Sequence, residues 1–288
     1  MTLQLNLLKQ EKRLFNHNHT MGEEVTMEKD RVKELANYVH NAEKEKREIT
    51  KITAELYPEL TIEEAYDVQE ELVRQKLEAG YKIVGPKMGI TSEAKMKQMN
   101  VDNPIYGYVF DNMVVEEGNA ISISDYIHPK IEPEIGFILN RDLEGPGITT
   151  LDVLRATEYV LPAIEIIDSR YENFNFTLPD VVADNTSAAG AVFGTYLRKP
   201  EELELDVVGV TLSLNGEIQS LGAGAAVLGH PAKSVASLAN MLSEKGEKVE
   251  AGKPILTGGV TAAVKLSPGD FVNVKYGGLG DVSFFVKQ

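Results

Sequence analysis

The first quarter of the chain contains two stretches in which apolar residues recur every three or four positions. The first stretch begins near Asp30, and its apolar stripe consists of Val32, Leu35, Ala36, Val39 and Ala42. The second begins at Thr61 with Thr-Ile-Glu-Glu, which has the form of a capping box, and ends at Gly80. These patterns predict two amphipathic helices, each packing one face against the rest of the protein.

From Lys82 onward the pattern changes to short apolar runs separated by Gly, Pro and Asp, which indicates a β-rich core. The runs lie at 82–84, 106–110, 120–123, 131–139, 160–167, 190–197, 207–214, 224–228, 254–257 and 271–286. Helices are predicted within this region from Pro231 to about Lys245 and over 150–156, the latter with Thr149 or Thr150 as N-cap. Strands and helices do not alternate regularly, so a doubly wound sheet is disfavoured and an α+β fold is expected.

Three segments are therefore expected along the 288 residues. Residues 1–27 are polar and aperiodic and predict a flexible tail. Residues 28–80 form the predicted N-terminal helical subdomain, and residues 81–288 form the predicted β-rich catalytic core.

Composition narrows the classes of function. The formal net charge of −15 argues against nucleic-acid binding, which needs clustered Lys and Arg. No stretch approaches the roughly 18 consecutive apolar residues of a membrane helix, and the N-terminus lacks the pattern of a secretory signal. The absence of cysteine excludes disulfides, thiolate nucleophiles and sulfur-ligated metals. A cytoplasmic location is expected.

Carboxylates in apolar runs are the first candidates for chemistry. Glu132 and Glu134 lie two residues apart in one run, and Glu165 interrupts another. Side chains alternate across a strand, so Glu132 and Glu134 are expected on the same face. Unpaired buried carboxylates are costly, and a hard divalent cation such as magnesium or manganese would offset that cost. The alternative is a surface strand whose polar face carries glutamate.

Lys87 and the turn at Thr257-Gly258-Gly259 are further candidates. Lys87 lies between glycines after a strand-like run and could neutralise a substrate carboxylate or donate a proton, or it could be a solvated turn lysine. The backbone amides of the 257–259 turn could hold a carboxylate, or the segment could be an ordinary turn. Lys130 and Arg170 could add local positive charge for an anionic substrate.

Other polar residues carry weaker signals. His230 precedes a predicted helix and could cap it or lie near a site, and His128 is equally ambiguous. Asp168 and Arg170 could support the metal ligands or form a structural ion pair. No serine has a plausible histidine and aspartate order around it, so a hydrolytic triad is not supported.

Seven ordered motifs resemble the fumarylacetoacetate hydrolase superfamily, in its branch of 2-keto-4-pentenoate hydratases and 4-oxalocrotonate decarboxylases. The resemblance runs from about Val32 to Phe285. Its motifs are Lys-Met-Gly-Ile-Thr-Ser (87–92), Pro-Ile-Tyr-Gly (104–107), Pro-Lys-Ile-Glu-Pro-Glu-Ile (129–135), Glu-Ile-Ile-Asp-Ser-Arg-Tyr (165–171), Ala-Asp-Asn (183–185), Gly-Ala-Gly-Ala-Ala-Val-Leu-Gly-His-Pro (222–231) and Leu-Thr-Gly-Gly-Val-Thr-Ala-Ala (256–263). The resemblance implies a mixed β-roll core of the fumarylacetoacetase C-terminal type with an N-terminal helical subdomain. It also implies that Glu132, Glu134 and Glu165 bind Mg²⁺ or Mn²⁺.

Two departures distinguish the activities within this branch. The hydratases typically have Asp in the place of Ile105 and Gly-Asn-Pro in the place of Gly229-His230-Pro231. Both departures favour the decarboxylase. An apolar Ile105 also suits a substrate with a second carboxylate, which an aspartate would repel, and it helps to desolvate the leaving carboxylate.

The resemblance thus implies metal-dependent decarboxylation of 2-oxohex-3-enedioate (4-oxalocrotonate) to 2-hydroxypenta-2,4-dienoate in the meta-cleavage breakdown of aromatic compounds. Lys87 would hold or protonate the substrate, Ile105 would form a wall, and the Thr257-Gly258 turn would bind a carboxylate. Tyr106 would offer a hydroxyl or simply pack. A 2-hydroxypentadienoate hydratase is the main alternative, and a non-catalytic binding protein on the same fold is a distant one. The implied partners are a dicarboxylate substrate, further copies of the chain, and the hydratase of the next step.

Overall fold

The structure, a computed structural model, describes residues 27–288. The flexible tail predicted at residues 1–27 lies outside the described residues except for Met27, which is buried against the core. The helices are α2 (Lys29–Glu45), α3 (Ile52–Glu55), α4 (Ile62–Glu78), α5 (Glu93–Met99), α6 (Thr150–Ala156), α7 (Leu178–Ala183) and α8 (Pro231–Ser243). No helix in this described range is long and apolar enough to cross a membrane.

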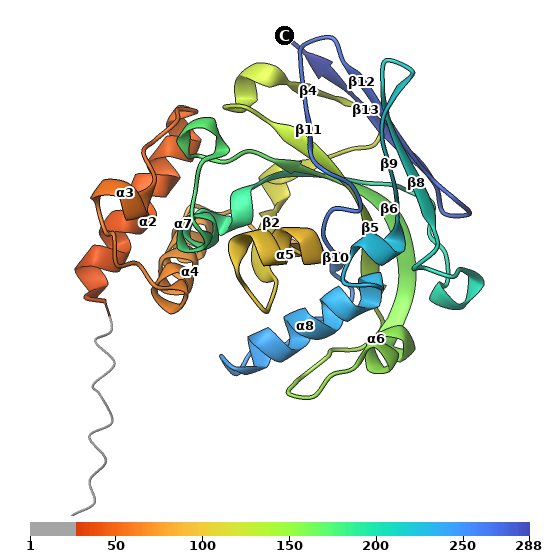
Figure 1. The fold of residues 1–288 in the computed structure, drawn as a ribbon, viewed down its shortest axis with the longest axis horizontal. Coiled ribbons are helices and arrows are strands. Elements are labelled where there is room, and N and C mark those ends of the chain that lie inside the picture. Colours follow the sequence, from red (N-terminus) through yellow and green to blue (C-terminus); the bar gives the residue numbers. More distant parts are fainter. Residues whose placement is uncertain (1–26) are drawn as a thin grey trace, which may run out of the picture.

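Two sheets form the β-rich part of the molecule. The first has the strand order β2 (Ile105–Phe110), β1 (Ile83–Gly89), β10 (Pro254–Leu256), β5 (Lys130–Leu139), β6 (Thr157–Ile167), β7 (Ala188–Phe193) and β3 (Val114–Val115), and β11 (Val264–Lys265) also pairs with β5. The second has the order β4 (Ala120–Ser122), β13 (Gly280–Lys287), β12 (Phe271–Tyr276), β8 (Gly209–Leu214) and β9 (Glu217–Ala223). The first sheet curls, with α2, α3, α4 and α7 at one end and α8 and α6 along one side (Figure 1). The predicted α+β class is confirmed.

The N-terminal helices form for the reasons that the sequence indicates. The buried residues of α2 are Leu35, Ala36, Val39 and Ala42, which are the predicted stripe. At the start of α4, Thr61 Oγ1 accepts the Glu64 amide at 3.2 Å and the Glu64 carboxylate accepts the Thr61 amide at 3.0 Å. This capping box satisfies two backbone donors that a helix end otherwise leaves unpaired. Helices α2 and α4 then pack against each other.

The later helices follow the prediction closely. Helix α6 spans the predicted range, and Thr149 is its N-cap. Helix α8 ends at Ser243, two residues before the predicted end at Lys245. His230 caps this helix, because its Nδ1 accepts the Ala232 amide at 3.1 Å, so the capping interpretation of His230 is confirmed.

Three parts of the prediction were wrong or incomplete. The run at 224–228 is a short 3₁₀ helix (Gly224–Ala226), and the strand is β9 immediately before it. The run at 190–197 is a strand only to Phe193. Helices α3, α5 and α7 were not predicted, because none is longer than seven residues and so short a segment shows little helical periodicity.

Candidate active site

The three predicted metal ligands meet on two neighbouring strands. Strands β5 and β6 are antiparallel, and their register places Glu132 directly opposite Glu165. Glu134 lies two residues along β5 and therefore on the same face as Glu132. One carboxylate oxygen from each residue lies within 4.8 Å of the others. We call these three residues the carboxylate cluster.

The carboxylate cluster is buried and short of hydrogen-bond donors. Glu134 and Glu165 are fully buried, and Glu132 is 7% exposed. Glu134 Oε2 accepts the Gly258 amide at 2.7 Å, whereas Glu134 Oε1 and both oxygens of Glu165 have no hydrogen-bond partner. The surface-strand alternative for these residues is therefore wrong. Buried acceptors without partners are rare in proteins and call for an explanation such as a bound ion.

Lys87 extends from β1 toward the same cluster. Its side chain is 2% exposed, and its ammonium lies 2.8 Å from Glu165 Oε1 and donates a hydrogen bond to the Thr186 carbonyl at 2.9 Å. The contact with Glu165 is a buried ion pair, and because a carboxylate has about four lone-pair sites, Glu165 can still bind another ligand. The solvated-turn alternative for Lys87 is wrong, since the side chain is buried between two strands.

An unusual turn presents the carbonyl that Lys87 contacts. Asn185, Thr186 and Ser187 all have positive φ angles, between 47° and 56°, which non-glycine residues rarely adopt. The Asn185 side chain accepts the Tyr108 amide at 2.8 Å and donates to the Tyr108 carbonyl at 2.9 Å, as a neighbouring strand would. Three strained residues in succession next to candidate ligands indicate a constrained functional segment.

Lys95, on α5, is a second lysine at the cluster, and the sequence analysis did not identify it. Its Nζ lies 2.8 Å from Glu132 Oε1, and its side chain is 44% exposed. Burial alone would lower the pKa of Lys95, but the Glu132 carboxylate outweighs this effect and the pKa is raised. Lys95 is therefore a protonated cation that is accessible from solvent.

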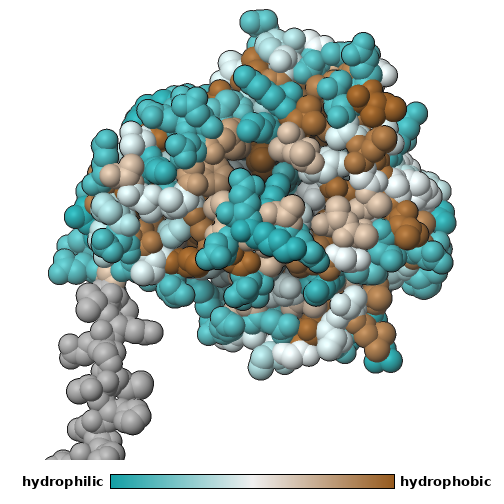
Figure 2. Space-filling view, viewed as in Figure 1, coloured by the Kyte–Doolittle hydropathy of each residue, from teal (hydrophilic) through white to brown (hydrophobic). Residues whose placement is uncertain are grey.

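A cavity of about 400 Å³ opens beside the carboxylate cluster. The charged residues in its lining are Lys87, Lys95 and Glu132, and the apolar part of the lining includes Ile105 and Phe176. Ile105 lies at the start of β2, opposite Gly89 of β1. In Figure 2 hydrophilic side chains cover the position of α5 and border a hollow with hydrophobic atoms. The cavity thus joins a charged end to an apolar wall.

The other three predicted substrate-binding residues do not face the cavity in the way that Ile105 does. Tyr106 points to the other side of β2, where its ring stacks on Tyr66 at 4.7 Å, and it does not line the cavity. The Thr257 hydroxyl donates to the Ile135 carbonyl at 2.7 Å. The Gly258 amide donates to Glu134, so this turn holds a carboxylate of the protein itself.

The other predicted cations lie outside the cavity. Arg170 is buried in a structural ion pair, but its partner is Asp184 and not the predicted Asp168. Asp168 accepts the amides of Ile127 and His128, each at 2.7 Å. The Lys130 ammonium lies 3.7 Å from the centre of a phenylalanine ring.

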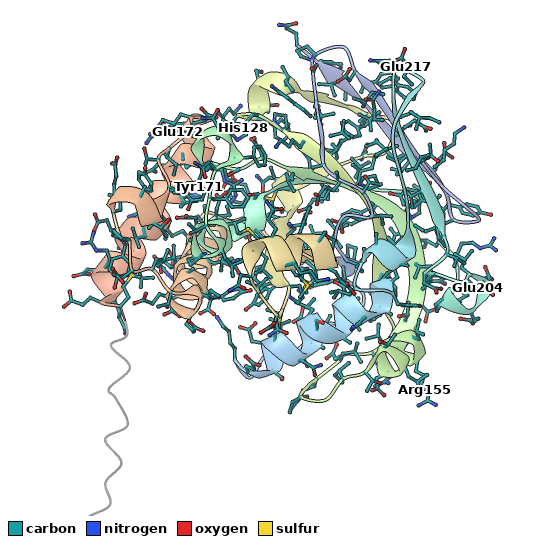
Figure 3. All side chains as sticks on the ribbon, in the orientation of Figure 1. His128, Arg155, Tyr171, Glu172, Glu204 and Glu217 are labelled. Carbon is teal, nitrogen blue, oxygen red and sulfur yellow. The ribbon has the colours of Figure 1, made fainter. Side chains whose placement is uncertain are left out.

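Several charged side chains far from the cluster are on the outside of the molecule. In Figure 3 Glu204 and Glu217 lie at the outer edge next to the second sheet, and Arg155 points outward at the end of α6. These side chains are exposed. These exposed side chains differ from the charged residues of the carboxylate cluster, which are buried.

The chemistry of the donor set fits a hard divalent cation. Burial, followed by repulsion from Glu165, raises the pKa of Glu134 well above its ordinary value of 4.5. Burial also raises the pKa of Glu165, although Lys87 opposes this shift. Glu134 and Glu165, together with Glu132, supply three carboxylates, the oxygen ligands that Mg²⁺ and Mn²⁺ prefer, and a cation would offset the repulsion between them.

The raised pKa values predict that magnesium stabilises the protein more at higher pH. In chelated protein, protonation of Glu134 and Glu165 contributes stability that is complete below pH 4.5 and is lost as the pH rises toward their folded-state values. Magnesium replaces those protons, so its effect should grow with pH. Melting temperatures with EDTA and with excess Mg²⁺ should differ by several degrees more at pH 8 than at pH 5.5. An equal difference at both pH values would contradict the prediction.

Comparison with known proteins identifies the family to which this site belongs. Residues 79–287 match the protein family described as fumarylacetoacetate (FAA) hydrolase C-terminal. The chain belongs to the fumarylacetoacetate hydrolase family. The matched residues include β5, β6, Lys87 and α5, so the carboxylate cluster and the cavity lie within the family domain.

Relatives within the FAA hydrolase family include decarboxylases and hydratases. A 4-oxalocrotonate decarboxylase of Pseudomonas sp. (strain CF600) is 50% identical over 258 residues, which are 90% of this chain and 97% of the relative. A 2-oxo-hept-4-ene-1,7-dioate hydratase of Escherichia coli is 39% identical over 86% of this chain and 95% of its own. The structure of 4-oxalocrotonate decarboxylase from Pseudomonas putida G7, complexed with magnesium and adipate, is 49% identical, has a TM-score of 0.88 and covers 91% of this chain and 99% of its own. The predicted family is confirmed.

Proposed function

We propose that this protein is a magnesium-dependent carboxy-lyase that converts 4-oxalocrotonate to 2-hydroxypenta-2,4-dienoate in the catabolism of aromatic compounds, in the cytoplasm. The observation that carries the proposal is a buried carboxylate cluster that opens into a cavity with Ile105 in its wall. Identity of 50% to a 4-oxalocrotonate decarboxylase, against 39% to a hydratase, supports decarboxylation over hydration.

Glu132, Glu134 and Glu165 are the proposed ligands of the metal. Three protein carboxylates leave coordination positions for the substrate's C1 carboxylate and C2 oxygen. The relative crystallised with magnesium supports Mg²⁺ as the ion, and Mn²⁺ suits the same oxygen donors. Bound magnesium would supply Lewis acidity that stabilises negative charge on the C2 oxygen.

The reaction needs one bond to break and one proton to arrive. The C5–C6 bond of the substrate breaks, C6 leaves as carbon dioxide, and the bonding electrons move through C4 and C3 to the C2 oxygen. That oxygen then takes a proton, giving the dienol product. The Lys87 ammonium, 2.8 Å from Glu165, lies at the charged end of the cavity and is the proposed proton donor.

The apolar wall has a role in the departure of carbon dioxide. A carboxylate loses its charge as it leaves, so surroundings that solvate it poorly favour the neutral product. Ile105, which is 3% exposed, would keep water away from that end of the substrate. The proposed contribution of the Thr257-Gly258 turn to substrate binding is indirect, because its Gly258 amide holds Glu134, a proposed metal ligand. Tyr106 is proposed to support β2 by stacking on Tyr66.

Substrate preference tests the function against its alternatives. Purified protein with Mg²⁺ should consume 4-oxalocrotonate and should hydrate 2-hydroxypenta-2,4-dienoate poorly or not at all. Rapid hydration of the dienoate would support the hydratase instead. Absence of turnover on both compounds, with and without Mg²⁺ or Mn²⁺, would support a non-catalytic binding protein.

We also propose that the protein self-associates and forms a complex with the hydratase of the next step. The product is a labile dienol, so direct transfer to the next enzyme would conserve it. Apolar side chains available for such contacts include Val207, Ile218 and Leu221, each more than 60% exposed. Co-expression with the hydratase should give one joint peak in size-exclusion chromatography. Two separate peaks at micromolar concentration would count against the complex.

A further inference from the structure

We infer that Lys95 binds the second carboxylate of the substrate, the one that leaves as carbon dioxide, and thereby selects dicarboxylates. This inference rests on the function proposed above and names the residue that recognises its substrate class. The lining contains Lys87 and Lys95 as its cationic residues, against a substrate that carries two negative charges.

Lys87 is not available to the second carboxylate. Its ammonium is fixed between the Thr186 carbonyl and Glu165, and its side chain is 2% exposed. In the proposed function the substrate's first carboxylate would be held at the carboxylate cluster by the metal, next to Lys87. The second carboxylate lies at the other end of a six-carbon chain and needs a cation that can move to meet it.

Lys95 lies in the right position for this contact, and its exposed side chain can change conformation. Its side chain is 44% exposed and lines the cavity together with Ile105. Its one ionic partner is Glu132, a proposed metal ligand, at 2.8 Å. A divalent cation on the cluster would offset most of the negative charge that attracts Lys95, which could then pair with the substrate instead.

Lys95 also lies on an element that can adjust. None of the residues of α5 is buried, and the helix is seven residues long. Its N-cap is Ser92, whose side chain accepts the Lys95 amide at 3.2 Å. The helix packs on the core through partly buried side chains such as Met99, so it is held less tightly than the helices that bury residues completely.

A contact with the leaving carboxylate makes a distinctive kinetic prediction. The contact is present in the bound substrate and is lost as neutral carbon dioxide forms. Removing it should weaken binding without slowing the chemical step. Lys95→Met should therefore raise KM about tenfold to a hundredfold, the range of a charge-assisted hydrogen bond, and should not lower kcat, which should rise to the extent that the contact is lost in the transition state.

Binding of unreactive carboxylic acids tests the inference without turnover. Adipate has the length and both charges of the substrate, whereas hexanoate has one charge. Calorimetry on the magnesium-loaded protein should show that Lys95→Met weakens adipate about tenfold to a hundredfold and hexanoate less than threefold. Lys95→Arg should retain most of the adipate affinity. Lys97→Met is the matched control, because Lys97 lies on the same helix with its side chain 81% exposed, and it should leave adipate binding unchanged.

Three results would overturn the inference. One is that wild-type protein binds adipate no more tightly than hexanoate, and another is that Lys95→Met weakens both acids equally. The third is a fall in Mn²⁺ affinity in Lys95→Met, measured by electron paramagnetic resonance, which would assign Lys95 to orienting Glu132. If adipate discrimination depends on Lys95 but the protein releases no carbon dioxide, the proposed function fails and the assignment of Lys95 stands.

Discussion

Glu165→Gln should lower the magnesium-dependent rate at least about a thousandfold while the protein stays folded. Glu165 is fully buried, and neither of its oxygens has a hydrogen-bond partner, so its proposed role is to bind metal. An amide removes one negative charge from a site that depends on carboxylate charge. Loss of the Lewis acid costs several kcal/mol of transition-state stabilisation, and each 1.36 kcal/mol is tenfold in rate. Glu132→Gln should behave in the same way.

Stability measurements separate this effect from unfolding. Replacing Glu165 relieves charge repulsion within the cluster but also removes the ion pair with Lys87, so the two effects oppose each other and the metal-free variant should melt within a few degrees of metal-free wild type. Glu158→Gln is the matched control, because Glu158 lies on the same strand, outside the cluster, and pairs with Lys199 at 2.6 Å. A near-wild-type rate in Glu165→Gln after chelation and return of magnesium would show that Glu165 is not a ligand.

Ile105→Asp should reduce decarboxylation at least about a hundredfold. The new carboxylate would replace a side chain that is 3% exposed and lines the cavity. Two like charges a few ångströms apart repel by several kcal/mol at the effective dielectric constant of such a site. Hydratase activity is not expected to appear, because one substitution rarely builds a proton path.

Ile105→Asn distinguishes charge from polarity. Asparagine has nearly the shape of aspartate without its charge, so this variant should retain clearly more decarboxylase activity. The rates of carbon dioxide release by the two variants, measured with saturating Mg²⁺, give the comparison. Equal losses would attribute the effect to polarity or packing, and an active Ile105→Asp enzyme would contradict the assignment of Ile105 to the substrate.

The sequence predicted those parts of the site that depend on local periodicity. The alternation of side chains along a strand placed Glu132 and Glu134 on one face, and helical spacing gave the buried face of α2. The position of Glu165 opposite Glu132 depends on the register between β5 and β6, which residue spacing alone does not determine.

The missed features depend on tertiary contacts without a local signature. Lys95 lies on a short helix with no buried residue, so no apolar stripe marked it. The left-handed turn at Thr186 contains no glycine, the residue that usually indicates such a conformation. The Gly258 amide could have bound any carboxylate, and only the fold shows that it contacts Glu134.

The most direct test of the account is the amount of carbon dioxide released per 4-oxalocrotonate consumed. Wild-type protein with Mg²⁺ should release one carbon dioxide per substrate molecule, with 2-hydroxypenta-2,4-dienoate as the first product detected by absorbance. The same protein with EDTA should release none above the uncatalysed rate, and returning Mg²⁺ should restore the release. Consumption of the substrate without carbon dioxide, or release that persists after chelation, would contradict a metal-dependent decarboxylase at the carboxylate cluster.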